Sequence, residues 1–310
     1  MIATITLNPA LDKMMTIANF TIGKTNRARF DHMEPGGKGI NVARVLKQLD
    51  CPVVASGFLA GNNGRYISQD LKAREICTEF VQVPGETRVN LKIIDPVSGT
   101  LTEINEPGFA VGEEHLRLLH QKVEELAKRC TVMVFSGSLP PGVPQDIYAT
   151  LLRIARKNGV KTVLDTSGEA LRNGLTERPD LIKPNLAEVE DFFQTKVDEE
   201  KALVDAAREL LLRGARMVVI SMGAAGALAA GGDGVIRASA PPIDTCSTVG
   251  AGDSMVAALA CGLTDGRPLG EKMRLATAAS MAALAECENK GEYPMLIEKF
   301  VPLVKVREIK

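Results

Sequence analysis

The chain has 310 residues, a mean hydropathy of +0.04, and 37 basic side chains against 38 acidic ones. This length is sufficient for one large α/β domain with a substantial hydrophobic core. Because the charges balance and no long run of Lys or Arg occurs, the composition excludes the basic surface typical of proteins that bind nucleic acids or anionic membranes. Small molecules are therefore the expected partners.

Short β-rich runs alternate with longer helical patterns along the chain. The runs that predict buried strands are residues 3–7, 53–59, 131–136, 161–165, 181–183 and 216–221. Between two of them, residues 113–129 predict an amphipathic helix, because Leu116, Leu119 and Val123 recur at helical spacing. Strands that alternate with helices predict a parallel sheet with right-handed crossovers.

Two stretches depart from this rhythm, at about residues 12–33 and 86–105. In both, polar and apolar residues alternate around turn signals, a pattern that predicts exposed antiparallel strands. Neither stretch is long enough to form its own core. We therefore expect them to pair as a small β-sheet lid over one edge of a single domain that spans residues 1–310.

The six cysteines lie far apart and include no CxxC pair. This spacing suits neither a disulfide framework nor a zinc site, and it indicates a reducing compartment. The first residues contain no basic leader before an apolar segment, and nowhere do eighteen uncharged apolar residues follow one another. We therefore expect a soluble cytoplasmic protein.

The strongest chemical signal is the segment STVGAGDS at residues 247–254, which leads directly into an apolar, helix-forming stretch. The start of a helix presents free backbone N–H groups and the positive end of the helix dipole, so an anion such as a transferring phosphoryl group can bind there. Asp253 lies in the same turn and could accept a proton from a hydroxyl that attacks the γ-phosphate. Alternatively, Asp253 is only a helix cap and the glycines form a tight turn.

Two further segments combine a turn with a helix start. In EPGGKGINVAR, at residues 34–44, Asn41 could bind sugar hydroxyls and Lys38 could supply charge; the alternative is a tight turn with a solvated lysine. In LIKPNLAE, at residues 181–188, Asn185 and Glu188 share one helix face and could orient a hydrated Mg²⁺ ion. The alternative there is a helix-capping arrangement.

Other nucleotide-binding signatures fail. Gly23-Lys24-Thr25 resembles the end of a phosphate-binding P-loop, but position 18 is alanine and no helical pattern follows. The chain also lacks the GxGxxG fingerprint of dinucleotide-binding folds, which argues against an oxidoreductase.

In this order, the segments resemble the ribokinase-like (phosphofructokinase B) carbohydrate kinases, from Ile5 to beyond Ala279. The resemblance implies a doubly wound, mainly parallel sheet flanked by helices, with a small β-sheet lid. It also implies ATP and Mg²⁺ as cofactors and Asp253 as the catalytic base. The backbone of Gly250, Ala251 and Gly252 would form the anion hole.

The motifs TLNPALD, GGKGINVAR, TRVN and SGSLP resemble members that act on phosphorylated ketohexoses. The substrate-binding residues implied by this resemblance are Asp12, Lys24, Arg27, Gly36, Gly37, Lys38, Asn41, Arg88, Asn90 and Ser138. Among them, cationic side chains would hold the existing phosphate, because an arginine can bind a phosphate in a bidentate manner. D-fructose 1-phosphate is the first expected substrate, with tagatose 6-phosphate and fructose 6-phosphate as alternatives.

On the nucleotide side, the resemblance implies that Lys183, Asn185 and Glu188 lie near the phosphates and Mg²⁺. The residues that would line the ATP groove are Ser221, Gly223, Gly226 and Ser247. A homodimer is expected, because exposed lid strands have unpaired edges. A sugar-phosphate-binding regulator that has kept the fold without the chemistry is the non-enzyme alternative.

Overall fold

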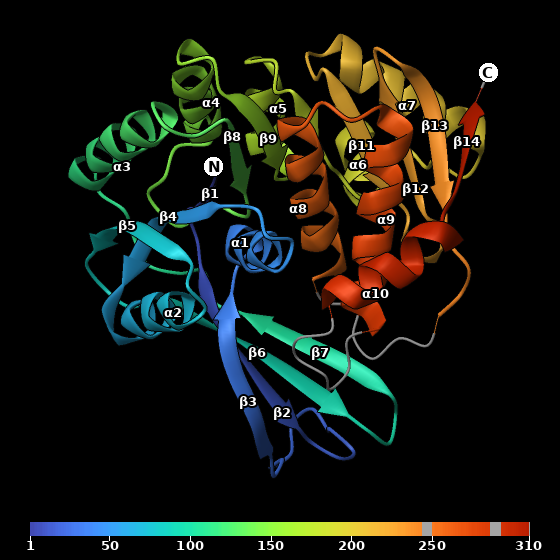
Figure 1. The fold of residues 1–310 in the computed structure, drawn as a ribbon. Coiled ribbons are helices and arrows are strands. Elements are labelled where there is room, and N and C mark those ends of the chain that lie inside the picture. The colour runs from blue at the N-terminus through green and yellow to red at the C-terminus, as the bar shows by residue number, and fades with distance from the viewer. Residues whose placement is uncertain (244–249, 286–292, 310) are drawn as a thin grey trace.

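A computed structural model describes residues 1–243, 250–285 and 293–309 (Figure 1). Within these residues the main sheet has the strand order β14-β13-β12-β11-β10-β9-β8-β1-β4-β5. Its strands are β1 (Ile2–Thr6), β4 (Val53–Ala60), β5 (Cys77–Val83), β8 (Val132–Ser136), β9 (Lys161–Asp165), β10 (Leu181–Ile182), β11 (Met217–Ser221), β12 (Ala227–Gly231), β13 (Gly234–Ser239) and β14 (Lys305–Ile309). From β5 to β11 all pairings are parallel, and from β11 to β14 they are antiparallel.

The helices are α1 (Lys38–Gln48), α2 (Gly61–Ala73), α3 (Glu113–Ala127), α4 (Ile147–Lys157), α5 (Gly168–Leu175), α6 (Leu186–Phe193), α7 (Glu200–Leu212), α8 (Ala251–Thr264), α9 (Leu269–Ala285) and α10 (Tyr293–Phe300). They cover both faces of the sheet. In β8, Met133 and Phe135 join one apolar core while Val132 and Val134 join the other, as the alternation of side chains along a strand requires. The predicted α/β fold with a mainly parallel sheet is therefore confirmed.

A second sheet, with the order β3-β2-β6-β7, projects away from the main body (Figure 1). We call it the lid sheet; its strands are β2 (Ala10–Thr16), β3 (Arg29–Gly36), β6 (Arg88–Asp95) and β7 (Thr100–Asn105). The expected antiparallel pairing is confirmed within each stretch, for β2 with β3 and for β6 with β7. It does not hold between the stretches, since β2 and β6 run parallel from Ala10↔Arg88 to Thr16↔Ile94. Both strands leave the main body in the same direction, which imposes this pairing. That the sheet acts as a lid on a single domain stays a prediction.

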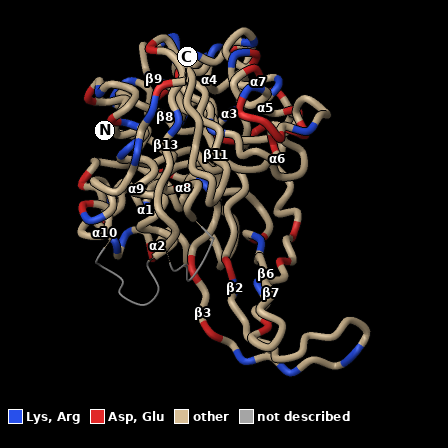
Figure 2. Tube along the Cα trace, turned by 90° about the vertical axis from the view of Figure 1, so that its right-hand side faces the viewer, with Lys and Arg blue, Asp and Glu red and all other residues tan. Residues whose placement is uncertain are grey.

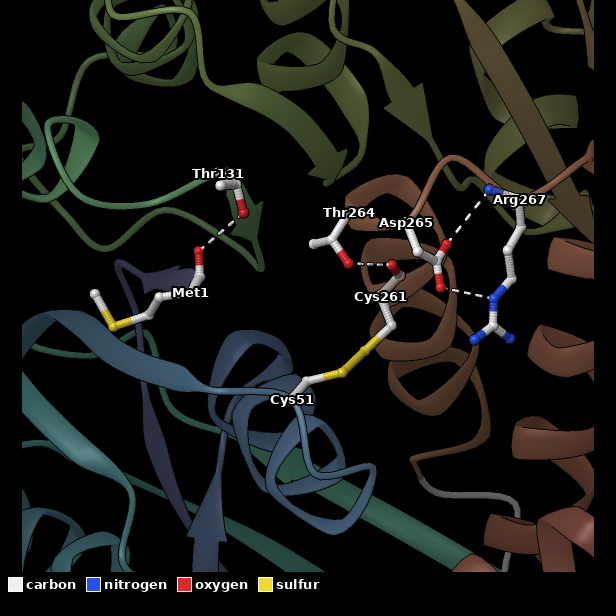
Figure 3. The surroundings of a disulfide bond; sticks show 7 residues. All are labelled: Met1, Cys51, Thr131, Cys261, Thr264, Asp265 and Arg267. Atoms are coloured by element: carbon white, nitrogen blue, oxygen red, sulfur yellow. Dashed lines mark hydrogen bonds and ion pairs between the residues drawn. A yellow bond between two sulfur atoms is a disulfide. The ribbon is translucent and has the colours of Figure 1, made fainter.

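A disulfide joins Cys51, in the loop after α1, to Cys261 in α8 (Figure 3). The expectation that no cysteines pair is therefore wrong. The two residues are 210 positions apart, and sequence spacing says nothing about side chains that the packing of α1 on α8 brings together. Of the other described cysteines, Cys77 and Cys130 are free thiols.

Reduction of this disulfide should lower the stability of the oxidised protein. In the chain-entropy model, a cross-link that closes a loop of this size contributes up to about 5 kcal/mol to the free energy of unfolding. We expect the melting temperature to fall when a phosphine reductant is added. The Cys51→Ala variant is the control and should melt at one temperature with or without the reductant. An unchanged melting temperature in fully reduced wild-type protein would show that the bond contributes nothing.

In the part of the chain that the structure describes, no helix has the length and apolar character needed to cross a membrane.

Candidate active site

The candidate residues converge at one edge of the main sheet. Parallel strands end together at this edge: Thr6 pairs with Ser136, and Ser136 pairs with Asp165, each the last residue of its strand. In open α/β sheets, ligands bind outside the carboxyl ends of the strands. Lys183 follows β10 at this edge, and the first turns of α1 and α8 supply the remaining groups.

Asp253 lies in the first turn of α8 and is buried. Asn41, in the first turn of α1, donates its Nδ2–H to Asp253 Oδ2 across 2.8 Å. The N-cap of α8 is Gly250, whose φ of 85° is a left-handed conformation that glycine adopts without strain. Asp253 is thus not the N-cap residue, and its carboxylate engages a side chain from another helix. This geometry favours the catalytic interpretation over capping.

Charged groups of both signs surround this carboxylate. Asp165 Oδ1 lies 3.2 Å from Lys38 Nζ and 3.7 Å from Lys183 Nζ, and Lys38 Nζ is also 3.7 Å from Glu188 Oε1. A Cβ built on Gly252 would lie 3.5 Å from Lys183 Nζ, so that ammonium group is next to the glycine turn. The turn therefore combines free N–H groups with two lysines, as an anion site requires.

Burial raises the pKa of Asp253, the nearby negative charge of Asp165 raises it further, and the result is a pKa of about 6. The hydrogen bond from Asn41 and the charges of Lys38 and Lys183 act in the opposite direction. Burial lowers the pKa of Lys38, but Asp165, Glu188 and Asp253 outweigh burial and raise it above its ordinary value. At neutral pH, Asp253 is thus a carboxylate beside Lys38 and Lys183, and a pKa of about 6 suits a general base.

If Asp253 is the catalytic base, kcat/KM should fall in mild acid. Because Asp253 must be deprotonated to accept a proton, kcat/KM should fall about tenfold per pH unit below the pKa of about 6. A substrate phosphate also titrates near this pH. The Asp165→Asn variant separates the two groups, because removal of the neighbouring negative charge lowers the pKa of Asp253 and should move the acid limb of its normalised profile to lower pH. If the acid limb stays at the same pH in this variant, the titrating group is the substrate phosphate.

The predicted sugar site lies where the lid sheet meets α1. Asp12, on β2, accepts a hydrogen bond from Asn90 Nδ2 at 3.0 Å, and its carboxylate lies against the glycine turn before α1. A Cβ built on Gly36 would lie 2.6 Å from Asp12 Cγ, so a side chain at position 36 would displace this carboxylate. Gly37 is the N-cap of α1, which places Asp12, Asn90 and Asn41 around one turn.

Arg88, the first residue of β6, is half-buried beside this cluster. Its Nη1 and Nη2 donate to the carbonyl oxygens of Glu106 and Asn8, at 2.9 Å and 3.1 Å. Its Nε is buried and has no hydrogen-bond partner among the described residues. A buried N–H group without a partner has a free-energy cost unless a ligand accepts it, so Arg88 fits an anionic substrate group.

The remaining substrate residues are exposed. Ser138 follows β8, and its Oγ accepts a hydrogen bond from Asn8 Nδ2 at 3.3 Å. Lys24 and Arg27 lie in the exposed connection between β2 and β3, where Figure 2 shows blue segments at the outer end of the lid sheet. Within the described residues, neither side chain contacts another candidate residue. Their role in phosphate binding stays a prediction.

Asn185 and Glu188 form a capping box at the start of α6: Glu188 N–H donates to Asn185 Oδ1, and Asn185 N–H donates to Glu188 Oε2. The capping alternative is thus realised, but it leaves Glu188 Oε1 directed toward Lys38. Asp165 Oδ2 is buried without a partner in the described residues. Both carboxylates face Lys38, and each could supply one oxygen to a magnesium ion, which takes only one or two protein carboxylates and keeps several waters.

The predicted ATP-groove residues lie at the adjacent strand end. Ser221 ends β11 and bridges to Asn185, while Gly223 and Gly226 flank the short turn between β11 and β12. Ser247 lies outside the described residues. Asp165, which the structure places between the two lysines, was not predicted as a site residue. The sequence feature that could have indicated it is an acidic residue at the end of a buried strand.

Comparison with known proteins agrees with the family resemblance seen in the sequence motifs. The model of the pfkB family carbohydrate kinases matches residues 5–290. The 1-phosphofructokinase of Rhodobacter capsulatus is 39% identical over 286 residues, which are 92% of this chain and 90% of that protein. A tagatose-6-phosphate kinase of Staphylococcus epidermidis is 34% identical, and the match covers 91% of each chain. The structure of phosphofructokinase-2 from Escherichia coli in complex with fructose-6-phosphate matches with a TM-score of 0.88 and 31% identity, over 96% of this chain and 98% of that one.

Proposed function

The chain belongs to the pfkB family of carbohydrate kinases, and on that premise we propose that it phosphorylates a ketohexose monophosphate, D-fructose 1-phosphate before all others. The product would be fructose 1,6-bisphosphate. One observation carries this proposal: a buried carboxylate, Asp253, lies in the first turn of α8 beside Lys38 and Lys183 and accepts a hydrogen bond from Asn41.

In the proposed reaction, the Asp253 carboxylate accepts the proton of a sugar hydroxyl while the hydroxyl oxygen attacks the γ-phosphorus of ATP. The bond from that phosphorus to the bridging oxygen breaks, and ADP leaves. Backbone N–H groups of Gly250, Ala251 and Gly252 stabilise the charge on the transferring group, together with Lys183. Asp12, Asn90, Gly36 and Gly37 surround the sugar, Asn41 orients Asp253, and Arg88 and Lys38 bind anionic groups.

On the nucleotide side, Ser221, Gly223, Gly226 and Ser247 are proposed to line the ATP groove. Glu188 and Asp165 would hold a magnesium ion, which, when bound, would neutralise phosphate charge. Asn185 Oδ1 already accepts the capping hydrogen bond from Glu188 N–H. Asn185 would therefore position Glu188 and would not bind the metal ion directly. We also propose a cytoplasmic location, where the Cys51–Cys261 bond would be reduced.

An assay of ADP release tests the proposal. Purified protein is incubated with MgATP and, in separate reactions, fructose 1-phosphate, tagatose 6-phosphate, fructose 6-phosphate or unphosphorylated fructose. We expect the highest kcat/KM with fructose 1-phosphate and little release without a sugar phosphate. A preference for tagatose 6-phosphate, the substrate named for one similar relative, would change the substrate assignment. Failure of every sugar phosphate to stimulate ADP release would favour the regulator alternative.

We also infer that two chains pair through their lid sheets. β3 and β7 are edge strands, and several apolar side chains on or near them are exposed, including Phe30 (54%), Leu101 (43%) and Ile104 (52%). Exposed strand edges with apolar side chains favour association with another chain. Analytical ultracentrifugation at micromolar concentration should give a dimer mass, and a monomer mass would contradict this inference.

A further inference from the structure

One strand of the lid sheet presents a row of polar side chains toward the sugar site. Residues at i, i+2 and i+4 of a strand share one face, so Arg88, Asn90 and Lys92 of β6 lie in line. The first two belong to the predicted substrate site. Lys92 does not, and yet it is the most buried of the three, with only 6% of its surface exposed. A lysine this deeply buried normally has an anionic partner.

The partner of Lys92 is Asp12. Its Nζ lies 2.8 Å from Asp12 Oδ2, while Asn90 Nδ2 lies 3.0 Å from Asp12 Oδ1, so β6 holds both oxygens of one carboxylate. The parallel register of β2 and β6 makes this possible, because Asp12 pairs with Asn90 and Lys92 stands two residues further along. Glu103 Oε1, on β7, is 4.0 Å from Lys92 Nζ, and the Glu103 side chain is 43% exposed.

The pairing leaves Asp12 able to bind a ligand. An ionised carboxylate has about four acceptor positions, and the contacts with Asn90 and Lys92 use two of them. The positive charge of Lys92 also offsets the negative charge of Asp12, which would otherwise repel a substrate phosphate near Arg88. The effect is large because charges interact more strongly where water is excluded. Both charge signs are visible along the lid strands in Figure 2.

We propose that Lys92 is a positioning residue for the sugar phosphate: it fixes the orientation of the Asp12 carboxylate and neutralises its charge. This inference rests on the proposed function. It differs from direct phosphate binding, because the Lys92 ammonium group faces Asp12, and Arg88 provides the unsatisfied donor. Sequence reasoning missed Lys92 because alternating polar residues in an exposed strand indicate a solvent-facing side.

The test is the Lys92→Met variant, assayed with the sugar phosphate that wild-type protein uses best. We expect KM for the sugar phosphate to rise about tenfold, which corresponds to about 1.4 kcal/mol. kcat should stay within about threefold of wild type, and KM for ATP should not change. Lys92→Arg, which keeps the charge, should recover most of the loss. The control is Lys13→Met, because Lys13 alternates with Asp12 on β2 and its Nζ lies over the Phe30 ring.

A double-mutant cycle with Asp12→Asn separates positioning from direct contact. If Lys92 acts through Asp12, Lys92→Met should add less than a twofold change in KM once Asp12 has been replaced. A full tenfold addition in that background would overturn the proposal, as would an unchanged KM in the Lys92→Met variant. If Lys92→Met melts below the assay temperature, Lys92→Gln, which can still donate one hydrogen bond, takes its place under the same criteria. Wild-type protein that is inactive with every sugar phosphate would overturn the proposed function instead.

Discussion

Replacement of Asp253 by asparagine is expected to lower kcat by about 10²- to 10⁴-fold while ATP still binds. The carboxamide has the same shape, and its oxygen can accept the hydrogen bond that Asn41 now donates to the carboxylate. It cannot accept the proton of the attacking hydroxyl. Steady-state ADP release measures the loss, and calorimetric titration with ATP measures nucleotide affinity in the same preparation.

Asp265→Asn is the matched control for this variant. Asp265 follows the C-terminal end of the same helix, α8, and pairs with Arg267 at the surface (Figure 3). Its replacement makes the same change of charge and should leave kcat within about twofold. Near-normal turnover in Asp253→Asn would mean that the hydroxyl loses its proton to another group. A variant that had lost ATP affinity as well would point to a binding role.

The second large effect is expected for Arg88→Met, which should raise KM for the sugar phosphate by about 10²-fold. Hydrogen bonds to a charged group contribute about 1.5–3 kcal/mol, and an arginine can offer a phosphate two of them. Methionine keeps much of the apolar stem but removes the donors, including the buried Nε that lacks a partner in the described structure. Initial rates over a wide range of sugar phosphate concentration measure the change.

Two comparisons make this prediction specific to the phosphate. Any residual activity with unphosphorylated fructose should be similar in wild type and Arg88→Met, because that sugar lacks the group that Arg88 would bind. Arg29→Met is the matched control, since Arg29 lies on the lid sheet but pairs with Asp31 at the surface. Equal losses with fructose and with its phosphate would assign Arg88 a structural role, through its contacts with the carbonyl oxygens of Asn8 and Glu106.

Much of the fold could be predicted from the sequence because strands that are buried on both faces form continuous apolar runs. All six predicted strands occur, as β1, β4, β8, β9, β10 and β11. The strands that sequence reasoning missed lie toward the two ends of the sheet. β12 consists of Ala, Leu and Gly, which have weak strand preference, and its only local signal was the tight turn at residues 232–233 that joins it to β13.

The candidate site could be predicted where a motif is local, but not where it depends on topology. The glycine turns before α1 and α8 are visible in the sequence, whereas the contact between Asn41 and Asp253 joins residues 212 positions apart. Asp165 and Lys92 were missed for the same reason, since each becomes significant only through a partner on another strand or helix. The roles assigned to all these side chains remain predictions until the variants are measured.

Because β2 and β6 run parallel, both strands leave the main body at the same end of the lid sheet, which we call its base. Ala10 and Arg88 pair where both strands leave the main body, and Thr16 and Ile94 pair at the far end. At about 3.3 Å per residue, Asp12 lies about 7 Å from the base of the lid sheet and Thr16 lies about 20 Å from it. A rotation of the sheet would therefore displace its tip about three times as far as Asp12. If the lid sheet rotates in this way, its far end could admit or exclude solvent while the groups proposed to hold the sugar move much less.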